Sequence, residues 1–257
     1  MQHRLAPHIK CFSTERGTVD VTNPYSGFNA NPFYGDTLEH VDLCQQTLCD
    51  HLEIAREKLI MPRQVHDTKV LEIKDETADS PLLEGVDALI SQVRGVCLCV
   101  STADCVPVFF HDTRNDVIGI AHAGWRGTVQ QIAVRTLDEM CHTFHTQATD
   151  INCVIGPSIG PEAFEVGDEV YQAFVDADFP MERIAFQRPS SAQDGTERWH
   201  INLWEANVWQ LTIVGVPPSN IHVCGICTYT YHRRFFSARR LGISSGRITN
   251  GIMIKPE

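Results

Sequence analysis

Three residues that are good transition-metal ligands lie at the edges of apolar segments, each beside small or turn-forming residues. They are His66, Cys105 and His122. Two imidazoles and one thiolate suit zinc, which at catalytic sites takes three protein ligands and keeps a fourth position for water or substrate. The spacings of 39 and 17 residues are wider than the close pairs of zinc fingers. We therefore predict one metal site, although such spacing is also compatible with structural histidines and a packed thiol.

The same atoms allow a second chemistry. Cys105 and His122, on neighbouring strands, would form a thiolate–imidazole pair for covalent hydrolysis without a metal. His66 favours the metal, because a cysteine hydrolase has no evident need for a second histidine at the same place. Zinc nucleobase deaminases also use histidine and cysteine, but their P-C-x-x-C signature is absent from this sequence. The metal-free hydrolase stays open as an alternative.

Two groups of arginines are candidates for binding an anion. The turn Gly124–Gly127 leads into a predicted helix, whose free N–H groups and dipole favour negative charge, and Arg126 lies in that turn. Arg239 and Arg240 are a second cationic pair in an acidic protein, with Arg247 nearby in the sequence. We predict that Arg126, Arg239 and Arg240 bind substrate or phosphate. The alternative is that they are solvated surface side chains.

Other reactive side chains are less specific. Cys224 and Cys227 form the only C-x-x-C in the chain, a spacing found in redox pairs and in halves of structural zinc sites. No second pair accompanies them, so we expect packed thiols. Glu165 and Asp168 are candidate acid or base groups, but Asp168 fits a helix cap equally well.

The elements that must position these residues alternate between strand and helix patterns. Strands feed helices through glycine-bounded turns, which brings polar residues at strand ends together. The mixture predicts an α+β fold of mixed α/β layers, with a mixed sheet flanked by helices, in one domain over residues 1–257. The expected helices are one within 37–60 capped by Asp36, one through Val129 and Met140, one through Val166 and Phe174, and one over 203–214 with Trp204, Val208 and Leu211 inward. The expected strands lie between 95 and 123 and at 151–155, 221–224 and 251–254. Residues 187–200 are expected to form a surface excursion.

The composition excludes some classes of function. The chain has 257 residues, 43% of them hydrophobic, which suits one large domain with a substantial core. Its formal net charge of −11 disfavours nucleic-acid binding, which depends on lysine and arginine. No apolar run reaches the roughly 18 residues of a membrane span, and the N-terminus lacks the apolar core of a signal peptide. We expect a cytoplasmic protein whose 10 cysteines are thiols.

Seven motifs, in order along nearly the whole chain, closely resemble the YfiH family. Its members are also called laccase-domain proteins, or purine nucleoside phosphorylase-type multicopper polyphenol oxidoreductases. The motifs are Gln-Val-His at 64–66, Thr-Ala-Asp-Cys-Val-Pro-Val at 102–108, His-Ala-Gly-Trp-Arg-Gly at 122–127, Gly-Pro-Ser-Ile-Gly-Pro at 156–161, Phe-Glu-Val-Gly at 164–167, Cys-Thr-Tyr at 227–229 and Phe-Ser-Ala-Arg-Arg at 236–240.

The resemblance implies a site, a fold and an activity. The ligand motif of the family falls on His66, Cys105 and His122 around one zinc, with copper the less favoured ion. The implied fold is an α/β/α-like layered domain related to a toxin deamidase that uses a Cys/His pair. The implied activities are phosphorolysis of adenosine, inosine and methylthioadenosine to the free base and ribose 1-phosphate, and deamination of adenosine. Purine nucleosides and phosphate are then the expected partners.

Two further alternatives stay open beside a nucleoside enzyme. An older claim for the family is copper-dependent oxidation of phenols, but multicopper oxidation needs many histidine ligands, often in His-x-His pairs. This chain has 12 histidines and no such pair. A non-catalytic metal-binding module is the other alternative, and it is expected if a fourth protein ligand, such as Cys99 or His111, closes the metal site.

Two positions depart from the family pattern, and the smaller change is Asp67, where glycine is usual. The usual Thr-Arg-x-Gly-Gly near the N-terminus is Thr-Glu-Arg-Gly-Thr here, with Glu15 in place of the arginine. If that arginine helps to hold phosphate, Glu15 weakens phosphorolysis. Arg16 is a poor substitute, because successive side chains of an extended segment point to opposite sides. We expect a phosphate response that is retained but weakened.

Overall fold

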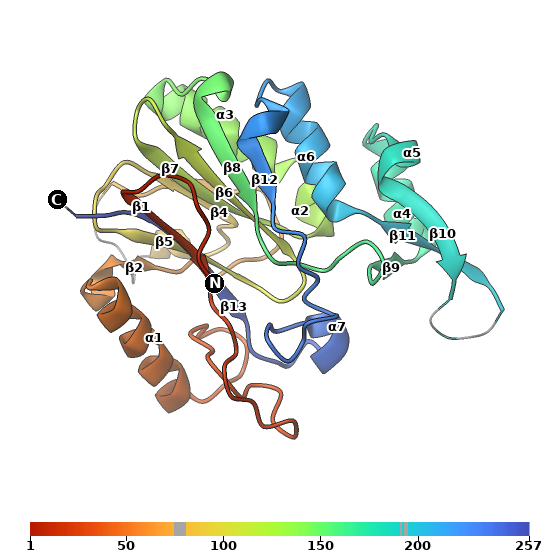
Figure 1. The fold of residues 1–257 in the computed structure, drawn as a ribbon, viewed down its shortest axis with the longest axis horizontal. Coiled ribbons are helices and arrows are strands. Elements are labelled where there is room, and N and C mark those ends of the chain that lie inside the picture. Colours follow the sequence, from red (N-terminus) through yellow and green to blue (C-terminus); the bar gives the residue numbers. More distant parts are fainter. Residues whose placement is uncertain (75–80, 191, 193–194, 257) are drawn as a thin grey trace.

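Two β-sheets lie face to face and are covered by helices on their outer sides, as the ribbon in Figure 1 shows. The computed structural model describes residues 1–74, 81–190, 192 and 195–256. The order of layers is helices, six-stranded sheet, four-stranded sheet, helix. The prediction of a mixed α/β fold is confirmed, but the layering is richer than the three layers that the family resemblance implied, because the apolar strands divide between two sheets.

The larger sheet carries the strand ends that form the candidate site. Its strand order is β12-β8-β6-β7-β4-β3, with both parallel and antiparallel pairs. Its central strands are rich in Val, Ile and Phe and are buried on both faces, which is the composition of interior strands. The bounds are β3 Val70–Glu72, β4 Ala88–Ser91, β6 Val106–Asp112, β7 Val117–Ala123, β8 Ile151–Ile155 and β12 Ile221–Val223.

The smaller sheet has the order β1-β13-β5-β2, and the main inter-sheet core lies between it and the larger sheet. Leu98 and Val100 of the smaller sheet pack in one cluster with Phe109, Ile118 and Ile120 of the larger sheet. These side chains are almost fully removed from water, so they stabilise the pairing of the sheets through hydrophobic burial. The bounds are β1 Ile9–Ser13, β2 Leu59–Ile60, β5 Cys97–Thr102 and β13 Ile248–Ile254.

Helix α1, Leu38–Leu52, covers the outer face of the smaller sheet (Figure 1). It begins after Thr37, whose side chain accepts a hydrogen bond from the backbone N–H of His40 at 3.3 Å. The prediction that Asp36 caps this helix is wrong, because the Asp36 carboxylate instead accepts from Asn29 Nδ2 at 2.7 Å and contacts His40 Nδ1 at 2.8 Å. The helix ends at Glu53, whose left-handed backbone (φ 59°) stops it well before residue 60.

The outer face of the larger sheet is covered by α2 Trp125–Val129, α3 Ile132–Phe144 and α6 Leu203–Ile213. The helix expected through Val129 and Met140 is two helices, because Gln131 adopts a left-handed conformation (φ 64°) between them. The helix expected at 203–214 is present as α6. Leu211 is buried as predicted, whereas Trp204 and Val208 are only partly buried, and Ala206, Asn207 and Gln210 take the interior positions instead.

A small third sheet and short helices complete the fold. The surface excursion predicted at 187–200 is a hairpin that projects from the body of the molecule (Figure 1), with residues 191 and 193–194 outside the described part. The helix expected through Val166 begins only at Asp168, since Val166 belongs to a strand. The bounds are β9 Glu165–Val166, β10 Ala185–Pro189, β11 Glu197–Ile201, α4 Asp168–Asp176, α5 Met181–Ile184 and α7 Ala238–Leu241, with 3-10 turns at Arg56–Lys58, Pro81–Leu83, Ala148–Asp150 and Pro218–Asn220.

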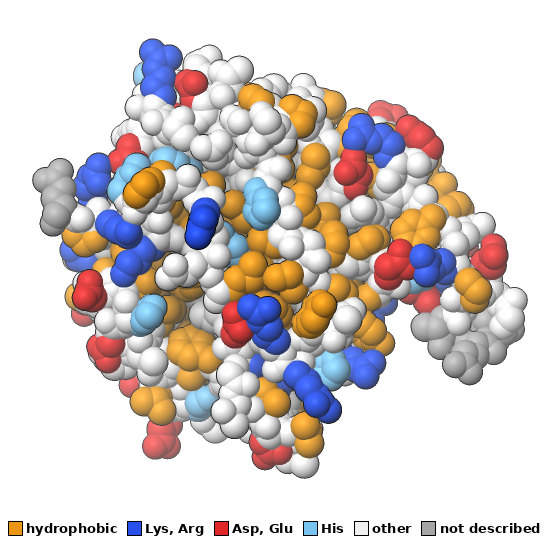
Figure 2. Space-filling model, in the orientation of Figure 1, with side chains coloured by type: hydrophobic (Ala, Val, Ile, Leu, Met, Phe, Trp, Pro, Cys, Tyr) orange, Lys and Arg blue, Asp and Glu red, His pale blue; other side chains and the backbone are white. Residues whose placement is uncertain are grey.

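The surface offers no continuous cationic field on the face drawn in Figure 2, where basic and acidic side chains are interspersed around exposed hydrophobic ones. This agrees with the formal net charge of −11. Among the described residues, no helix has both the length and the hydrophobicity needed to cross a bilayer.

Candidate active site

The structure brings His66, Cys105 and His122 together at one end of the β6–β7 hairpin. Their possible ligand atoms all lie within 4.8 Å of one another. Nε2 of His66 is 3.8 Å from the Cys105 sulfur, and the two imidazole centroids are 4.7 Å apart. The hairpin register explains the approach of Cys105 and His122. Val106 pairs with Ala123, so the residue before β6 and the penultimate residue of β7 lie at the same sheet edge.

Asp87 connects the two histidines, and the sequence analysis did not identify it. Its fully buried carboxylate contacts Nδ1 of His122 at 2.8 Å through Oδ1. The same carboxylate accepts three backbone N–H bonds, from Val65, His66 and Asp67, each at 3.0 Å. Asp87 therefore fixes the orientation of one imidazole and the loop that carries the other. Its signal in the sequence was an aspartate inside the apolar segment Val-Asp-Ala-Leu-Ile, where a charge needs strong partners.

His66 lies in a strained loop conformation. Its φ of 63° is in the left-handed region, which non-glycine residues adopt at an energetic cost. The three N–H bonds to Asp87 hold this conformation in place. Strain that the surroundings maintain is typical of functional loops, where it directs a side chain toward a site.

Cys105 is positioned by its neighbour Asp104, which also has a left-handed backbone (φ 86°). The Asp104 carboxylate accepts hydrogen bonds from Thr228 Oγ1 and from the backbone N–H of Arg239, both at 2.7 Å. Its carbonyl accepts from the N–H of Ile159 at 2.9 Å. Asp104 thus joins three segments that are far apart in the sequence to the residue before Cys105. These segments carry the motifs at 156–161, 227–229 and 236–240, so all three are hydrogen-bonded to the residue before Cys105.

Gly124 closes the site from the side of α2. A Cβ atom at this position would lie 3.0 Å from the Cys105 sulfur and 3.2 Å from Cδ2 of His66. Its φ of −63° is open to any residue, so the glycine is required by space and not by backbone conformation. The glycine therefore allows the two side chains to approach each other.

The charges of the site favour a thiolate. Burial alone would raise the pKa of Cys105, but His122, and then His66, outweigh burial and lower the pKa to about 6. Burial would lower the pKa of His122, whereas Cys105 and Asp87 raise it to about 9. At neutral pH, without a bound ion, the arrangement is a thiolate beside an imidazolium. The thiolate is the form of cysteine that binds metals and attacks carbon.

The donor set fits a tetrahedral zinc ion. Zinc bonds of ordinary length separate a cysteine sulfur and an imidazole nitrogen by about 3.6 Å, close to the 3.8 Å between Cys105 and His66. Since Asp87 occupies Nδ1 of His122, the other ring nitrogen is left for the ion, as in the carboxylate–histidine–metal arrangements of zinc enzymes. Cys99 and His111, the fourth ligands considered from the sequence, contact other groups, Cys97 and Asp116. The described residues of this group thus provide three ligands and leave one position open.

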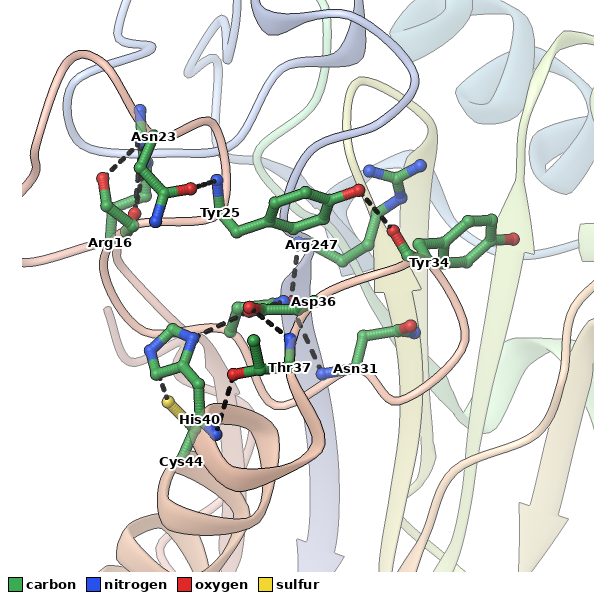
Figure 3. A network of polar contacts seen from close by, with 12 residues as sticks. Arg16, Asn23, Tyr25, Asn31, Tyr34, Asp36, Thr37, His40, Cys44 and Arg247 are labelled. Carbon is green, nitrogen blue, oxygen red and sulfur yellow. Dashed lines mark hydrogen bonds and ion pairs between the residues drawn. The ribbon is translucent and has the colours of Figure 1, made fainter.

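An aromatic and a cationic side chain, Tyr34 and Arg247, are coupled electrostatically to the thiol. The guanidinium of Arg247 lies 4.2 Å from the centroid of the Tyr34 ring, and Figure 3 shows the two side by side. Burial raises the pKa of Tyr34, and Arg247 opposes this while the charges of Cys105 and Asp87 add to it. Burial likewise lowers the pKa of Arg247, against the opposing effects of Tyr34 and then Cys105. The charge of Cys105 therefore affects the pKa of both Tyr34 and Arg247. Tyr34 was not among the residues predicted from the sequence.

The three arginines predicted to bind phosphate lie in different settings. The exposed guanidinium of Arg126 stacks 4.3 Å from the centroid of Trp125, at the start of a helix of only five residues. Arg239 donates to the carbonyl of Glu165 at 2.9 Å, while its backbone N–H holds Asp104. Arg240 donates to the hydroxyl of Tyr229 at 3.1 Å. The backbone of Arg239 therefore supports the site directly, and the guanidinium groups remain candidates for an anion.

Glu15, which replaces the family arginine, is an ionised carboxylate whose charge is balanced by cationic neighbours. Both of its carboxylate oxygens contact Arg234 at 2.7 Å, and the N-terminal amine is 3.3 Å away. The hydrogen bond from Arg234 is the largest cause that lowers the pKa of Glu15 to about 2. Arg16 is buried, and its guanidinium donates hydrogen bonds to the carbonyls of Ser26 and His232. It is therefore less available to bind an anion than a surface arginine. Glu15 therefore presents little net charge to an incoming anion.

The two thiols of the C-x-x-C segment contact different groups. Cys224 contacts Nδ1 of His3 at 3.4 Å, and Cys227 accepts the backbone N–H of Gly160 at 3.2 Å. All ten cysteines are free in the structure. The interpretation of Asp168 as a helix cap is wrong, because Gly167 holds the capping position of α4 and Asp168 is the first residue of the helix itself.

Comparison with known proteins shows what this chain resembles. Residues 9–255 match the model of a family described as multi-copper polyphenol oxidoreductase laccase. A purine nucleoside phosphorylase of Bacteroides thetaiotaomicron is 46% identical over 253 residues, covering 96% of this chain and 92% of that protein. Adenosine deaminase RL5, from an unknown prokaryotic organism, is 41% identical, covering 96% and 94%. The crystal structure of YlmD from Geobacillus stearothermophilus has a TM-score of 0.87 and 29% identity, covering 98% of this chain and 94% of that chain.

Proposed function

We propose a function from the premise that this chain belongs to the multi-copper polyphenol oxidoreductase laccase family: it is a zinc-dependent enzyme that cleaves purine nucleosides with phosphate. The observation that carries the proposal is the group of His66, Cys105 and His122, with Asp87 behind one imidazole and a ligand position left open. The relatives named purine nucleoside phosphorylase support the reaction class. The single catalytic domain would span the whole chain.

Each residue of the group has a defined task in this proposal. His66, Cys105 and His122 hold the ion, which when bound supplies Lewis-acid chemistry to the substrate. Asp87 keeps the proton of His122 on Nδ1, so that the other nitrogen faces the ion. Asp104 and Gly124 keep Cys105 at the sheet edge. We favour zinc over the copper that the family description suggests, because multicopper oxidation needs several copper centres with many histidine ligands. Among the described residues, the one other possible ligand group is His8, His111 and Asp116.

The substrate would lie against Tyr34 and Arg247. A purine is planar and polarisable, so an aromatic ring with a stacked guanidinium is a suitable wall for it. In phosphorolysis a phosphate oxygen forms a bond to C1′ of the ribose, the bond from C1′ to the purine nitrogen breaks, and the purine leaves with a proton. The cationic side chains of Arg126, Arg239 and Arg240 are the candidates for holding the phosphate. The neutralised Glu15 supports a phosphate response that is retained.

The experiment that tests the proposal is product analysis. Purified protein is incubated with adenosine, inosine or methylthioadenosine, with and without phosphate. The expected products are the free base and ribose 1-phosphate, formed only with phosphate. Inosine and ammonia from adenosine, formed without phosphate, would instead indicate deamination. This second activity is favoured by the relative named adenosine deaminase RL5. The absence of both product sets from all three nucleosides would reject a nucleoside enzyme.

A metal-free hydrolase is the other candidate that a specific observation supports. Cys105, His122 and Asp87 have the order of a thiol, a base and an orienting carboxylate. Metal analysis separates the two functions. About one zinc per chain at the Cys105 group supports the nucleoside enzyme, whereas a metal-free protein that is inactivated by one alkylation at Cys105 supports the hydrolase.

A further inference from the structure

A second group of metal-ligating side chains lies at the opposite end of β6. His8, His111 and Asp116 place their possible ligand atoms within 4.8 Å of one another. Oδ1 of Asp116 lies 2.8 Å from Nε2 of His8 and 3.3 Å from Nε2 of His111. The two imidazoles meet edge to face, with centroids 5.6 Å apart. One carboxylate oxygen thus faces two imidazole nitrogens.

Three segments that are distant in the sequence hold this second group in place. His8 lies in the turn before β1, where its carbonyl accepts the N–H of Lys255 at 2.8 Å. His111 projects from β6, and only 2% of its side chain is exposed. Asp116 is the last residue of the tight turn between β6 and β7 and has a left-handed φ of 53°. The turn is built around the buried Asp112, which accepts two backbone N–H bonds. The geometry is therefore set by backbone that is itself hydrogen-bonded.

The buried imidazole of His111 has unused binding capacity. Its Nδ1 has no hydrogen-bond partner among the described residues, and its Nε2 contact of 3.3 Å is longer than a typical bond. The two ring nitrogens point in divergent directions, so the ion would bind Nε2, the nitrogen that faces Asp116, and the unpartnered Nδ1 is a separate feature of this ring. The other oxygen of Asp116, Oδ2, is held by Arg94 at 2.7 Å, so Oδ1 is the oxygen that is oriented toward the two rings.

We propose that His8, His111 and Asp116 form a second site, which binds a divalent transition-metal ion such as Zn²⁺. Two imidazoles and a monodentate carboxylate are a common ligand set for zinc, with water in the fourth position. Bonds of ordinary length to a tetrahedral ion would separate the ligand atoms by about 3.4 Å. The distance to His111 already has this value, and the exposed His8 needs only a small outward movement.

The second site is separate from the Cys105 group. Cys105 directly precedes β6 and His111 is the sixth residue of that strand. At about 3.3 Å per residue the two groups are roughly 20 Å apart. No ligand is shared, so the second site does not depend on the proposed function. An ion bound there would link the segment before β1 to the β6–β7 turn, and it would stabilise the folded chain against unfolding.

Cobalt titration of the metal-free full-length chain tests this proposal. Co²⁺ takes similar ligands to Zn²⁺, and only an ion bound to a thiolate gives a sulfur-to-cobalt charge-transfer band. We expect the wild type to bind two ions per chain, one with this band and one without it. His8→Ala should still bind the ion that gives the band. Its affinity for the other ion should fall by more than the roughly 10–100-fold that is lost when an outer-shell partner of a metal ligand is removed. Asp116→Asn keeps a residue that tolerates the left-handed backbone and should weaken the same ion.

Matched controls separate the two metal sites. Cys105→Ala should lose the charge-transfer band and keep the second ion. His142→Ala, which removes an exposed histidine of α3, should bind both ions as the wild type does. A wild type that binds no ion without the band, or a His8→Ala variant that binds this ion with unchanged affinity, overturns the proposal. Because His8→Ala reports on the second site and Cys105→Ala on the first, failure of one is distinguishable from failure of the other.

Discussion

Oδ1 of Asp87 lies 2.8 Å from Nδ1 of His122, and the same carboxylate holds the loop of His66 through three backbone N–H bonds. One buried side chain thus sets the position of two candidate metal ligands that are 56 residues apart in the sequence. This relationship leads to the first of five predictions.

Asp87→Asn should weaken metal binding by about 10–100-fold, because the amide cannot orient the imidazole as a carboxylate does. The measurement is a zinc competition titration at neutral pH. The matched control is Asp36→Asn, which changes another largely buried carboxylate that contacts a histidine, His40, at 2.8 Å. Equal zinc affinity in wild type and Asp87→Asn would show that Asp87 has no part in the metal site.

Cys105→Ala should reduce the zinc content of the purified protein from about one ion at this site to a small fraction, because two imidazoles alone bind zinc weakly. Elemental analysis after purification without chelator gives the content. Cys141→Ala, which removes a half-buried thiol of α3, should leave it unchanged. Full zinc occupancy in Cys105→Ala would mean that the thiolate is not a ligand.

Gly124→Ala should impair the site while leaving the fold intact. The added methyl group would lie 3.0 Å from the Cys105 sulfur and 3.2 Å from His66, so one of the two must move. We expect zinc affinity to fall by about tenfold, a change of roughly 1.4 kcal/mol. Gly119→Ala is the control, because the three nearest atoms to its methyl group would belong to Met140, Ile90 and Phe110, at 3.1, 3.3 and 3.5 Å, and none of these is a candidate ligand. Unchanged zinc affinity and activity in Gly124→Ala would contradict this prediction.

Arg126→Ala should raise the phosphate concentration needed for phosphorolysis by about tenfold to a hundredfold, the value of one charge-assisted contact of roughly 1.5–3 kcal/mol. Zinc content should not change. The test is the rate of base release against phosphate concentration, with Arg135→Ala as the control for an exposed arginine of α3. A rate that does not change across millimolar phosphate, with no ribose 1-phosphate among the products, would refute phosphorolysis and favour deamination as the activity.

His3 should make the protein less stable as the pH falls from about 6.5 to 4. Burial is the main cause that lowers the pKa of His3 to about 4, and the ring contacts Ser13 and Cys224. The unfolded chain takes up the proton near pH 6.5 but the folded chain does not, so unfolding is favoured within this window. The loss amounts to about 2–3 kcal/mol. Urea unfolding at pH 7, 5.5 and 4.5 should show a smaller pH dependence in His3→Gln than in wild type; an identical dependence would exclude this role of His3.

Local patterns in the sequence were sufficient to predict much of the fold and the identity of the candidate ligands. The apolar runs around Cys105 and His122 form the hairpin of β6 and β7, because strands rich in Val, Ile and Phe pair wherever a buried sheet accepts them. Residue type, position at the edges of apolar segments and the family motifs together indicated His66, Cys105 and His122. The order of motifs indicated the family, and the comparisons confirmed it.

Only the tertiary structure decided how those residues are held and what surrounds them. Asp87, Asp104 and Tyr34 act through contacts with segments distant in the chain, and such contacts leave no periodic trace in the sequence. Thr37 caps α1 in place of the predicted Asp36, because the carboxylate of Asp36 contacts Asn29 and His40. Glu15 looks like an isolated charge in the sequence, but Arg234, more than 200 residues later, neutralises it. Local propensity therefore determined the elements, and long-range hydrogen bonding and charge pairing determined the site.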